Sequence, residues 1–292
     1  MSHLTLVPKN EHFIREVFTD FLLSREAMLC SPATLDFYKY TAGKFVTWLV
    51  KKSISNPEDI LSSHVRAYLA SLRSRNLKAN TIHSHARAIK TFLRFCHQEN
   101  YIPCHVKFEM PRVPNKAMPL LNPKQIKQVM RACRSIKHKA LVYVLLDTGL
   151  RRAETSKPCW GDVDINSGIV RVSKGKGGKS RSVVIGVKTR RILLRYRRNV
   201  PNAISDSVFN LSGHGIRSAL RRIGERVGIR LTAHMFRRTF ATLSIKNGMN
   251  PLHLQGLLGH SSLEIVRRYI QILDGDLMQA HREYGPVDKY LK

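Results

Sequence analysis

The spacing of apolar residues predicts helices over most of the first 112 positions. Apolar side chains recur every three or four residues between Phe13 and Leu22 and again between Ile82 and Cys96. This is the period of one face of an amphipathic helix. Ser31-Pro32 and Asn56-Pro57 each place a capping side chain before a proline, which is a common helix start. Residues 1–112 are therefore predicted to form a four-helix bundle.

The stretch Pro111–Pro119 separates this region from the rest of the chain. It contains three prolines, which resist regular structure. Residues 113–121 are therefore predicted to be a linker between a helical domain, residues 1–112, and a second domain, residues 122–292.

The pattern in the second domain predicts mainly helix with one small β-hairpin. Asn122-Pro123 is another helix start, and an apolar run from Ala140 ends near Gly149. Two β-branched segments, Ile169–Val172 and Ser182–Ile185, bracket a glycine-rich turn, which indicates a hairpin. Helical periodicity then returns at about 188–199, 216–227, 234–247, 252–258 and 263–273.

The charge of the chain points to nucleic acid. The net charge is +30, of which residues 1–112 contribute +7 and residues 113–292 contribute +23. A protein this basic most often binds a polyanion. The basic stretches Lys51–Ser53 and Ser71–Ala79 are equally consistent with phosphate contacts and with solvated loops.

Other classes of protein fit poorly. No apolar run approaches the roughly 20 residues of a membrane helix. The five cysteines include no C-x-x-C pair, which argues against a disulfide scaffold or a cysteine zinc site. The sequence also lacks an H-E-x-x-H motif or a carboxylate cluster. We expect a cytoplasmic protein without a membrane anchor or a metal ion.

The glycine-rich turn nearly matches a nucleotide-binding phosphate loop. In Ser173–Ser180, however, a serine replaces the first glycine, and Arg181–Ile185 reads as a strand where the motif requires a helix. A lysine-rich hairpin tip fits better, so an NTPase remains only an alternative. Four basic side chains would then project toward a polyanion: Lys174, Lys176, Lys179 and Arg181.

Three further motifs carry candidate chemistry. His234 and Arg237 share one helical face and together could hold a phosphate, although Arg238 could equally be the clamp on spacing alone. Arg151 follows a predicted helix end, and Glu154 lies one turn later, where it could fix a neighbour. The third motif runs from Leu257 to Tyr269, and its Ser261-x-x-Glu264 capping box starts a helix just after His260.

Taken in order, these motifs closely resemble those of the tyrosine recombinases, the lambda-integrase and Xer-type family. The resemblance covers about residues 120–270, whereas residues 1–112 match the core-binding domain of the family only in size and pattern. Arg238 stands where the family usually has a second histidine. One residue appears inserted before Gly175, so Lys174 competes with Lys176 for one role.

The resemblance implies site-specific DNA recombination without a cofactor. Tyr269 would attack a backbone phosphate and form a 3′-phosphotyrosine, while Lys176 protonates the leaving 5′-oxygen. Arg151 and Arg237 would hold the phosphate oxygens, because one guanidinium group can form two parallel hydrogen bonds to a phosphate. His234 would assist Tyr269. His260 would donate to the phosphate, Glu154 would brace the set, and DNA would also contact Lys174, Lys179, Arg181 and Arg238.

The implied partners are double-stranded DNA sites and further copies of the chain. Four protomers would hold two paired sites, and the C-terminal tail of each would dock on a neighbouring protomer. The protein would act at the nucleoid. Integration, excision and resolution of a mobile element or replicon all remain open, as does the participation of an accessory DNA-bending protein or a partner recombinase. A DNA-binding protein without catalysis and a type IB topoisomerase are the competing hypotheses.

Overall fold

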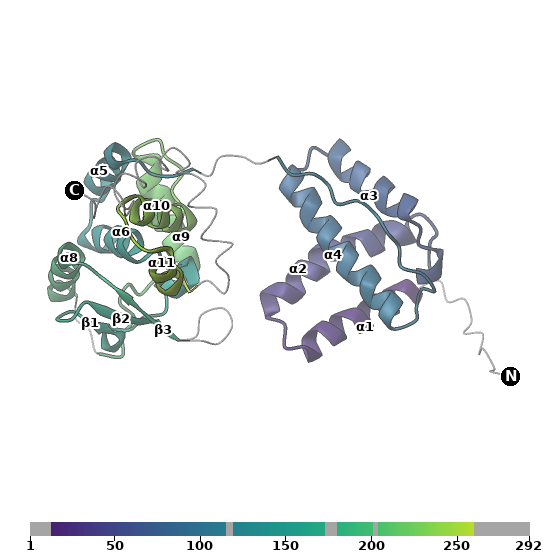
Figure 1. The fold of residues 1–292 in the computed structure, drawn as a ribbon, viewed down its shortest axis with the longest axis horizontal. Helices are drawn as coiled ribbons and strands as arrows, with labels where there is room; N and C mark the ends of the chain where they lie inside the picture. Colours follow the sequence, from purple (N-terminus) through teal and green to yellow (C-terminus); the bar gives the residue numbers. More distant parts are fainter. Residues whose placement is uncertain (1–12, 115–118, 173–179, 201–203, 260–292) are drawn as a thin grey trace, which may run out of the picture. The chain divides into compact units, whose positions relative to one another are not determined.

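The computed structural model describes residues 13–114, 119–172, 180–200 and 204–259. The chain divides into two compact units, residues 1–117 and 118–292, and each unit has its own hydrophobic core (Figure 1). The predicted linker spans this division. Among the helices in the described ranges, none is long and apolar enough to cross a membrane.

The described part of the first unit, residues 13–114, contains four α-helices, as predicted. They are α1 (Phe13–Ala27), α2 (Pro32–Val50), α3 (Ser62–Ser74) and α4 (Ala79–Gln98). Helix α4 packs against each of the other three. Its inner face carries the predicted apolar stripe, whose members are all buried, so burial of this stripe holds the bundle together.

Aromatic side chains fill the centre of the bundle. The ring of Phe21 meets the rings of Phe92 and Phe95 edge-on, with both centroid distances 5.4 Å. Phe21 and Phe92 are fully buried. Edge-to-face contacts of this kind add to the gain from burial. The second helix starts as predicted, because Ser31 Oγ accepts a hydrogen bond from the Thr34 amide at 3.3 Å.

The prediction that one of the bundle helices starts at Asn56-Pro57 is wrong. Pro57–Asp59 forms only one 3-10 turn, η1, and the Asn56 side chain makes no cap hydrogen bond. Ile60 follows in an extended conformation (φ −76°, ψ 113°) with its side chain buried in the core. This extended residue interrupts the helical path, and α3 begins only at Ser62.

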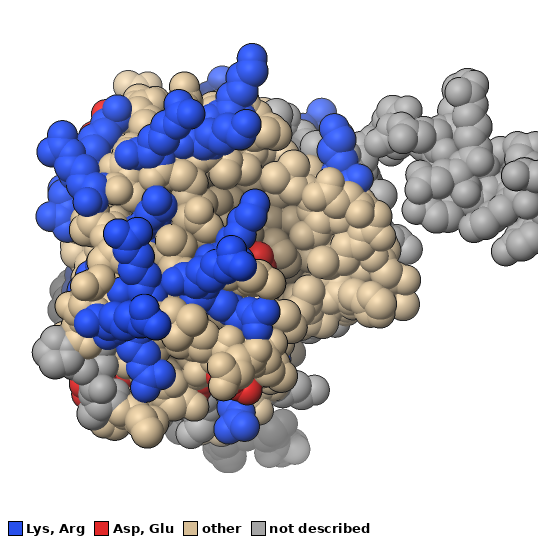
Figure 2. Space-filling view, turned by 90° about the vertical axis from the view of Figure 1, so that its left-hand side faces the viewer, with Lys and Arg blue, Asp and Glu red and all other residues tan. Residues whose placement is uncertain are grey.

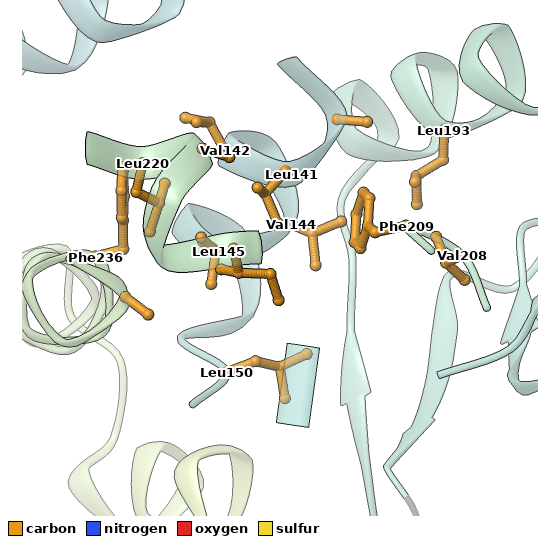
Figure 3. Packing of buried hydrophobic residues seen from close by; sticks show 14 of the residues in the cluster. Leu141, Val142, Val144, Leu145, Leu150, Leu193, Val208, Phe209, Leu220 and Phe236 are labelled. Atoms are coloured by element: carbon orange, nitrogen blue, oxygen red, sulfur yellow. The ribbon is translucent and has the colours of Figure 1, made fainter. Parts of the chain in front are cut away.

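In the second unit, α6 (Ile136–Thr148) lies at the centre. Helices α8 (Val187–Arg198) and α10 (Ala233–Lys246) both pack against it. Figure 3 shows side chains of α6 between Leu193 of α8 and Phe236 of α10. The other helical elements in the described residues of this unit are α5 (Pro123–Ala132), α7 (Arg152–Thr155), η2 (Trp160–Asp162), α9 (Gly213–Glu225) and α11 (Pro251–Leu258).

The predicted helix positions agree with the structure to within three residues for α8 to α11. The helix predicted at 263–273 lies outside the described residues. Helix α5 begins at Pro123 as expected, with Asn122 Oδ1 accepting from the Gln125 amide at 2.8 Å. The mainly helical fold class with a small sheet is confirmed.

A three-stranded antiparallel sheet covers one side of this unit. Its strands are β1 (Val163–Asp164), β2 (Ile169–Val172) and β3 (Arg181–Val184), in that order across the sheet. Val170 pairs with Val183 in the register of the hairpin, and both side chains are buried. The hairpin was predicted. Strand β1 was not, because two residues are too few to show an alternating pattern.

The strand that follows the glycine-rich turn contradicts the NTPase alternative. A phosphate loop must lead into a helix whose first amides bind the anion. Here β3 begins at Arg181 and pairs with β2. The turn itself, residues 173–179, lies outside the described residues.

Candidate active site

Arg151 is positioned by the abrupt end of α6. Gly149 ends this helix in the left-handed conformation (φ 59°), and Arg151 then becomes the N-cap of the short helix α7. Glu154 Oε2 accepts a hydrogen bond from the Arg151 amide at 2.9 Å, and Glu154 Oε1 accepts one from Arg151 Nη1 at 2.7 Å. The contact between these two residues is the one their spacing predicted, and it fixes the direction of the Arg151 side chain.

A second arginine binds the same carboxylate from another element. Arg181, the first residue of β3, donates from Nη1 to Glu154 Oε1 at 3.1 Å and from Nη2 to Oε2 at 2.8 Å. Its Nε donates to the Leu257 carbonyl of α11 at 3.1 Å. The expectation that Arg181 projects toward DNA is therefore wrong. All three nitrogens of its guanidinium are used inside the protein, where they join β3 to α7 and α11.

The environment of Glu154 favours its charged form. Burial by itself would raise the pKa of this carboxyl group. Hydrogen bonds from the Arg181 side chain and from the Arg151 amide and side chain outweigh burial and lower the pKa to about 2. Glu154 is therefore ionised at neutral pH and holds both arginines by charge.

Arg237 connects α10 to the ends of two other helices. Its Nη1 donates to the Gly149 carbonyl at 2.8 Å, and its Nη2 donates to the Leu258 carbonyl at 2.6 Å. The residue is only 3 % exposed. Gly149 lies two residues before Arg151, so these bonds hold the guanidinium of Arg237 beside the loop that carries Arg151. Arg238 instead lines a separate hollow with Pro119.

His234 stands at the beginning of α10. Thr232 caps this helix, and its Oγ1 accepts from the Met235 amide at 3.1 Å. Partial burial of the imidazole, followed by the positive charges of Arg238 and Arg237, lowers the pKa of His234 below its usual value. His234 is therefore neutral at pH 7 and can accept a proton.

A basic hollow of about 500 Å³ joins these elements. Arg151 and His234 both line it, and no acidic side chain is among its lining residues. Three of its arginines were not singled out from the sequence, because they lie on different elements that only the fold brings together. They are Arg152, Arg217 and Arg230. Such a hollow attracts an anion, and guanidinium groups suit a phosphate.

Five of the residues predicted for the site cannot be placed. Lys174, Lys176, Lys179, His260 and Tyr269 lie outside the described residues. The described part of the chain brings Arg151, Glu154, His234 and Arg237 together on one unit. Within that part, no group of three or more His, Cys, Asp or Glu side chains could hold a metal ion.

Comparison with protein families shows two matches along the chain. Residues 119–275 match the phage integrase family, and residues 17–102 match the phage integrase N-terminal SAM-like domain. Tyrosine recombinase XerA of Saccharolobus solfataricus is 30 % identical over 84 % of this chain and 84 % of that protein. Tyrosine recombinase XerC of Oceanobacillus iheyensis is 25 % identical over 88 % of this chain and 91 % of that protein.

Solved structures share the fold. A lambda integrase dimer bound to a COC′ core site matches with a TM-score of 0.74 and 17 % identity, covering 87 % of this chain and 94 % of that one. XerH site-specific recombinase bound to a difH substrate matches with a TM-score of 0.62 and 19 % identity, covering 95 % and 91 % of the two chains.

Proposed function

The chain belongs to the phage integrase family, and we propose that it is a site-specific recombinase that breaks and rejoins DNA through a 3′-phosphotyrosine. The observation that carries this proposal is the arrangement around Glu154. One ionised carboxylate fixes Arg151 at the edge of a basic hollow, while Arg237 is held beside the same loop. Relatives named tyrosine recombinases align over most of the chain.

The proposed reaction exchanges one ester for another, so it needs no nucleotide. The phenol oxygen of Tyr269 attacks the phosphorus, the bond to the 5′-oxygen breaks, and a 3′-phosphotyrosine forms. In the second step the 5′-hydroxyl of a partner strand attacks the same phosphorus and releases Tyr269. The number of phosphate ester bonds is the same before and after each step.

Each side chain has one task in this scheme. Arg151 and Arg237 hold the non-bridging oxygens, where negative charge gathers in the transition state. His234 accepts the proton of the Tyr269 phenol, whose ordinary pKa of about 10 keeps it protonated at neutral pH. Lys176 gives a proton to the leaving oxygen. His260 donates a hydrogen bond to the phosphate, and Lys174, Lys179 and Arg238 contact neighbouring phosphates.

The assembly on DNA is part of the same proposal. Structural neighbours include a lambda integrase dimer on a core site and XerH on its difH substrate, which supports duplex DNA as the ligand. We infer that four protomers pair two sites and that residues 275–292 dock on a neighbouring protomer. The protein would act in the cytoplasm at the nucleoid, and its five free cysteines are consistent with a reducing compartment.

Covalent capture on DNA tests this function. The protein is incubated with fragments of the DNA that flanks its gene, and adducts that survive detergent are sequenced. A recombinase gives adducts at a defined site, and a plasmid carrying two copies of that site is then recombined. No adduct would indicate DNA binding without catalysis. Adducts without site preference, together with plasmid relaxation, would indicate a topoisomerase.

A further inference from the structure

Helix α8 is unusually basic. Six of its twelve residues are Lys or Arg, and none is acidic. Lys188, Arg191, Arg195 and Arg198 follow one another at intervals of three, four and three, which places them on one face of the helix. All four are exposed. We call these four residues the α8 basic stripe.

The core fixes the direction of this stripe. Thr189, Leu193 and Tyr196 are the buried residues of α8, and they occupy the opposite side of the helix. The stripe therefore faces solvent. The other two basic residues of α8, Arg190 and Arg197, are not part of the stripe, because their side chains make contacts within the unit.

Those two residues have partners inside the unit. Arg190 donates hydrogen bonds to the carbonyls of Ile165 and Asn166. The guanidinium of Arg197 lies over the ring of Trp160, 5.4 Å from its centroid. Within the described ranges, no comparable side-chain contact involves the four stripe residues.

Repulsion within the stripe lowers the stability of its own helix, although the helix dipole favours Arg195 and Arg198 in the last turn. Like charges three or four residues apart repel each other, and Lys188 stands in the first turn, where the helix dipole disfavours a cation. Among the described residues, none of the four stripe residues forms a salt bridge. A bound polyanion would supply the missing negative charge.

The stripe is also separated from the candidate active site. Helix α6 lies between α8 and α10, the helix that carries His234 and Arg237 (Figure 1). Figure 2 shows the side of the unit that bears α5 and α8, where Lys and Arg side chains gather with few acidic ones among them. DNA held at the site and DNA held at the stripe would thus be different segments.

We propose that the α8 basic stripe binds the phosphates of a second duplex segment, independently of sequence. The stripe spans ten residue steps, or about 15 Å, along a duplex that carries one phosphate charge per roughly 1.7 Å of its axis. Three of its members are arginines, and each guanidinium can donate two parallel hydrogen bonds to a phosphate. Phosphate contacts of this kind position DNA without reading its bases.

Native mass spectrometry of the full chain tests this proposal. The protein is mixed with a short random-sequence duplex that cannot wrap from one face of the unit to another, and duplexes per monomeric chain are counted. The wild type is expected to bind two duplexes. The double variant Arg191→Gln/Arg195→Gln should keep the first duplex and lose most of the second. The slope of log affinity against log salt for the second duplex should fall by about 1.8.

Two control variants distinguish an effect of the stripe from a general effect of net positive charge. The pair Arg171→Gln/Lys246→Gln removes the same charge from β2 and the end of α10 and should still bind two duplexes. Arg191→Lys/Arg195→Lys keeps the charge and should retain the second duplex. A wild type that binds one duplex, or equal loss in both Gln pairs, would overturn the proposal. The assay needs no cleavage, so its failure is distinct from a failure of the recombinase function.

Discussion

Glu154 and Arg181 are joined by two parallel hydrogen bonds, although 27 residues separate them in the chain. The same carboxylate also binds the amide and the guanidinium of Arg151. The pair therefore connects the first strand residue after the glycine-rich turn to the loop that presents Arg151. One carboxylate thus bonds both to the start of β3 and to the side chain that we assign to the phosphate.

Glu154→Gln is expected to destabilise the second unit. The change removes a buried carboxylate and leaves two partly buried guanidiniums without their negative partner. Losing one member of a buried ion pair costs about 3 kcal/mol. The free energy of unfolding in urea measures the effect. Glu225→Gln is the control, because its ion pair with Arg221 is exposed and 3.6 Å long. That variant should change stability by less than about 0.5 kcal/mol. Equal effects in the two variants would contradict the bracing role of Glu154.

Gly149→Ala is expected to lower both stability and DNA cleavage. Gly149 has φ 59°, and a Cβ there would lie 2.7 Å from Phe240 Cδ1 and 2.9 Å from Leu258 Cδ2. We expect a loss of about 2–4 kcal/mol, from left-handed strain together with overpacking. Cleavage should fall because the Gly149 carbonyl holds Arg237.

Gly228→Ala separates the two causes. Gly228 has φ 64°, but a Cβ there would meet nothing within 4 Å. This variant carries only the backbone strain, so it should lose about 1 kcal/mol and keep its cleavage rate. Matching losses of stability and activity at the two glycines would show that the packing around Gly149 does not position Arg237.

The rate of covalent adduct formation should depend on pH through His234. A proton acceptor must be neutral, and burial together with the surrounding arginines keeps the pKa of His234 below its usual value. The rate is therefore expected to be flat at pH 7 and to fall only below about 6.5, the ordinary histidine value. Single-turnover rates at saturating DNA measure this. An inflection above 6.5 that disappears in His234→Gln would contradict the assignment.

Lys176→Ala should be rescued by a better leaving group. If Lys176 protonates the 5′-oxygen, a substrate with sulfur at that position no longer needs the proton. We expect cleavage of the sulfur substrate near the wild-type rate and slow cleavage of ordinary DNA. Lys174→Ala serves as the matched control and should show no such difference. The opposite pattern would assign the proton donor to Lys174.

Much of the fold could be predicted from local patterns. Helices α1, α4 and α8 to α11 follow from apolar periodicity. Ser31-Pro32 marks the start of α2, and Asn122 caps α5 as its sequence indicates. The failure at Asn56-Pro57 has a tertiary cause, because the buried side chain of Ile60 is reached through an extended residue. The residues around Asn56 do not by themselves indicate that Ile60 is extended and buried.

Contacts within the site could be predicted only between residues that are close in sequence. The contact between Arg151 and Glu154 follows from their spacing on a helix. The pairing of Arg181 with Glu154 does not, because it depends on where the fold places the first residue of β3. Spacing alone likewise left Arg237 and Arg238 equivalent as clamps, and only the family resemblance favoured Arg237. In the structure, hydrogen bonds to Gly149 and Leu258 place Arg237 beside the Arg151 loop.

The nucleophile is the central claim, and identification of the modified tyrosine tests it most directly. The protein is trapped on nicked DNA that cannot be religated, and the peptide that carries the nucleotide is sequenced. We predict that Tyr269 carries the 3′-phosphate and that Tyr269→Phe binds the DNA normally but forms no adduct. An adduct on Tyr284 or Tyr290, or full cleavage by Tyr269→Phe, would contradict the account.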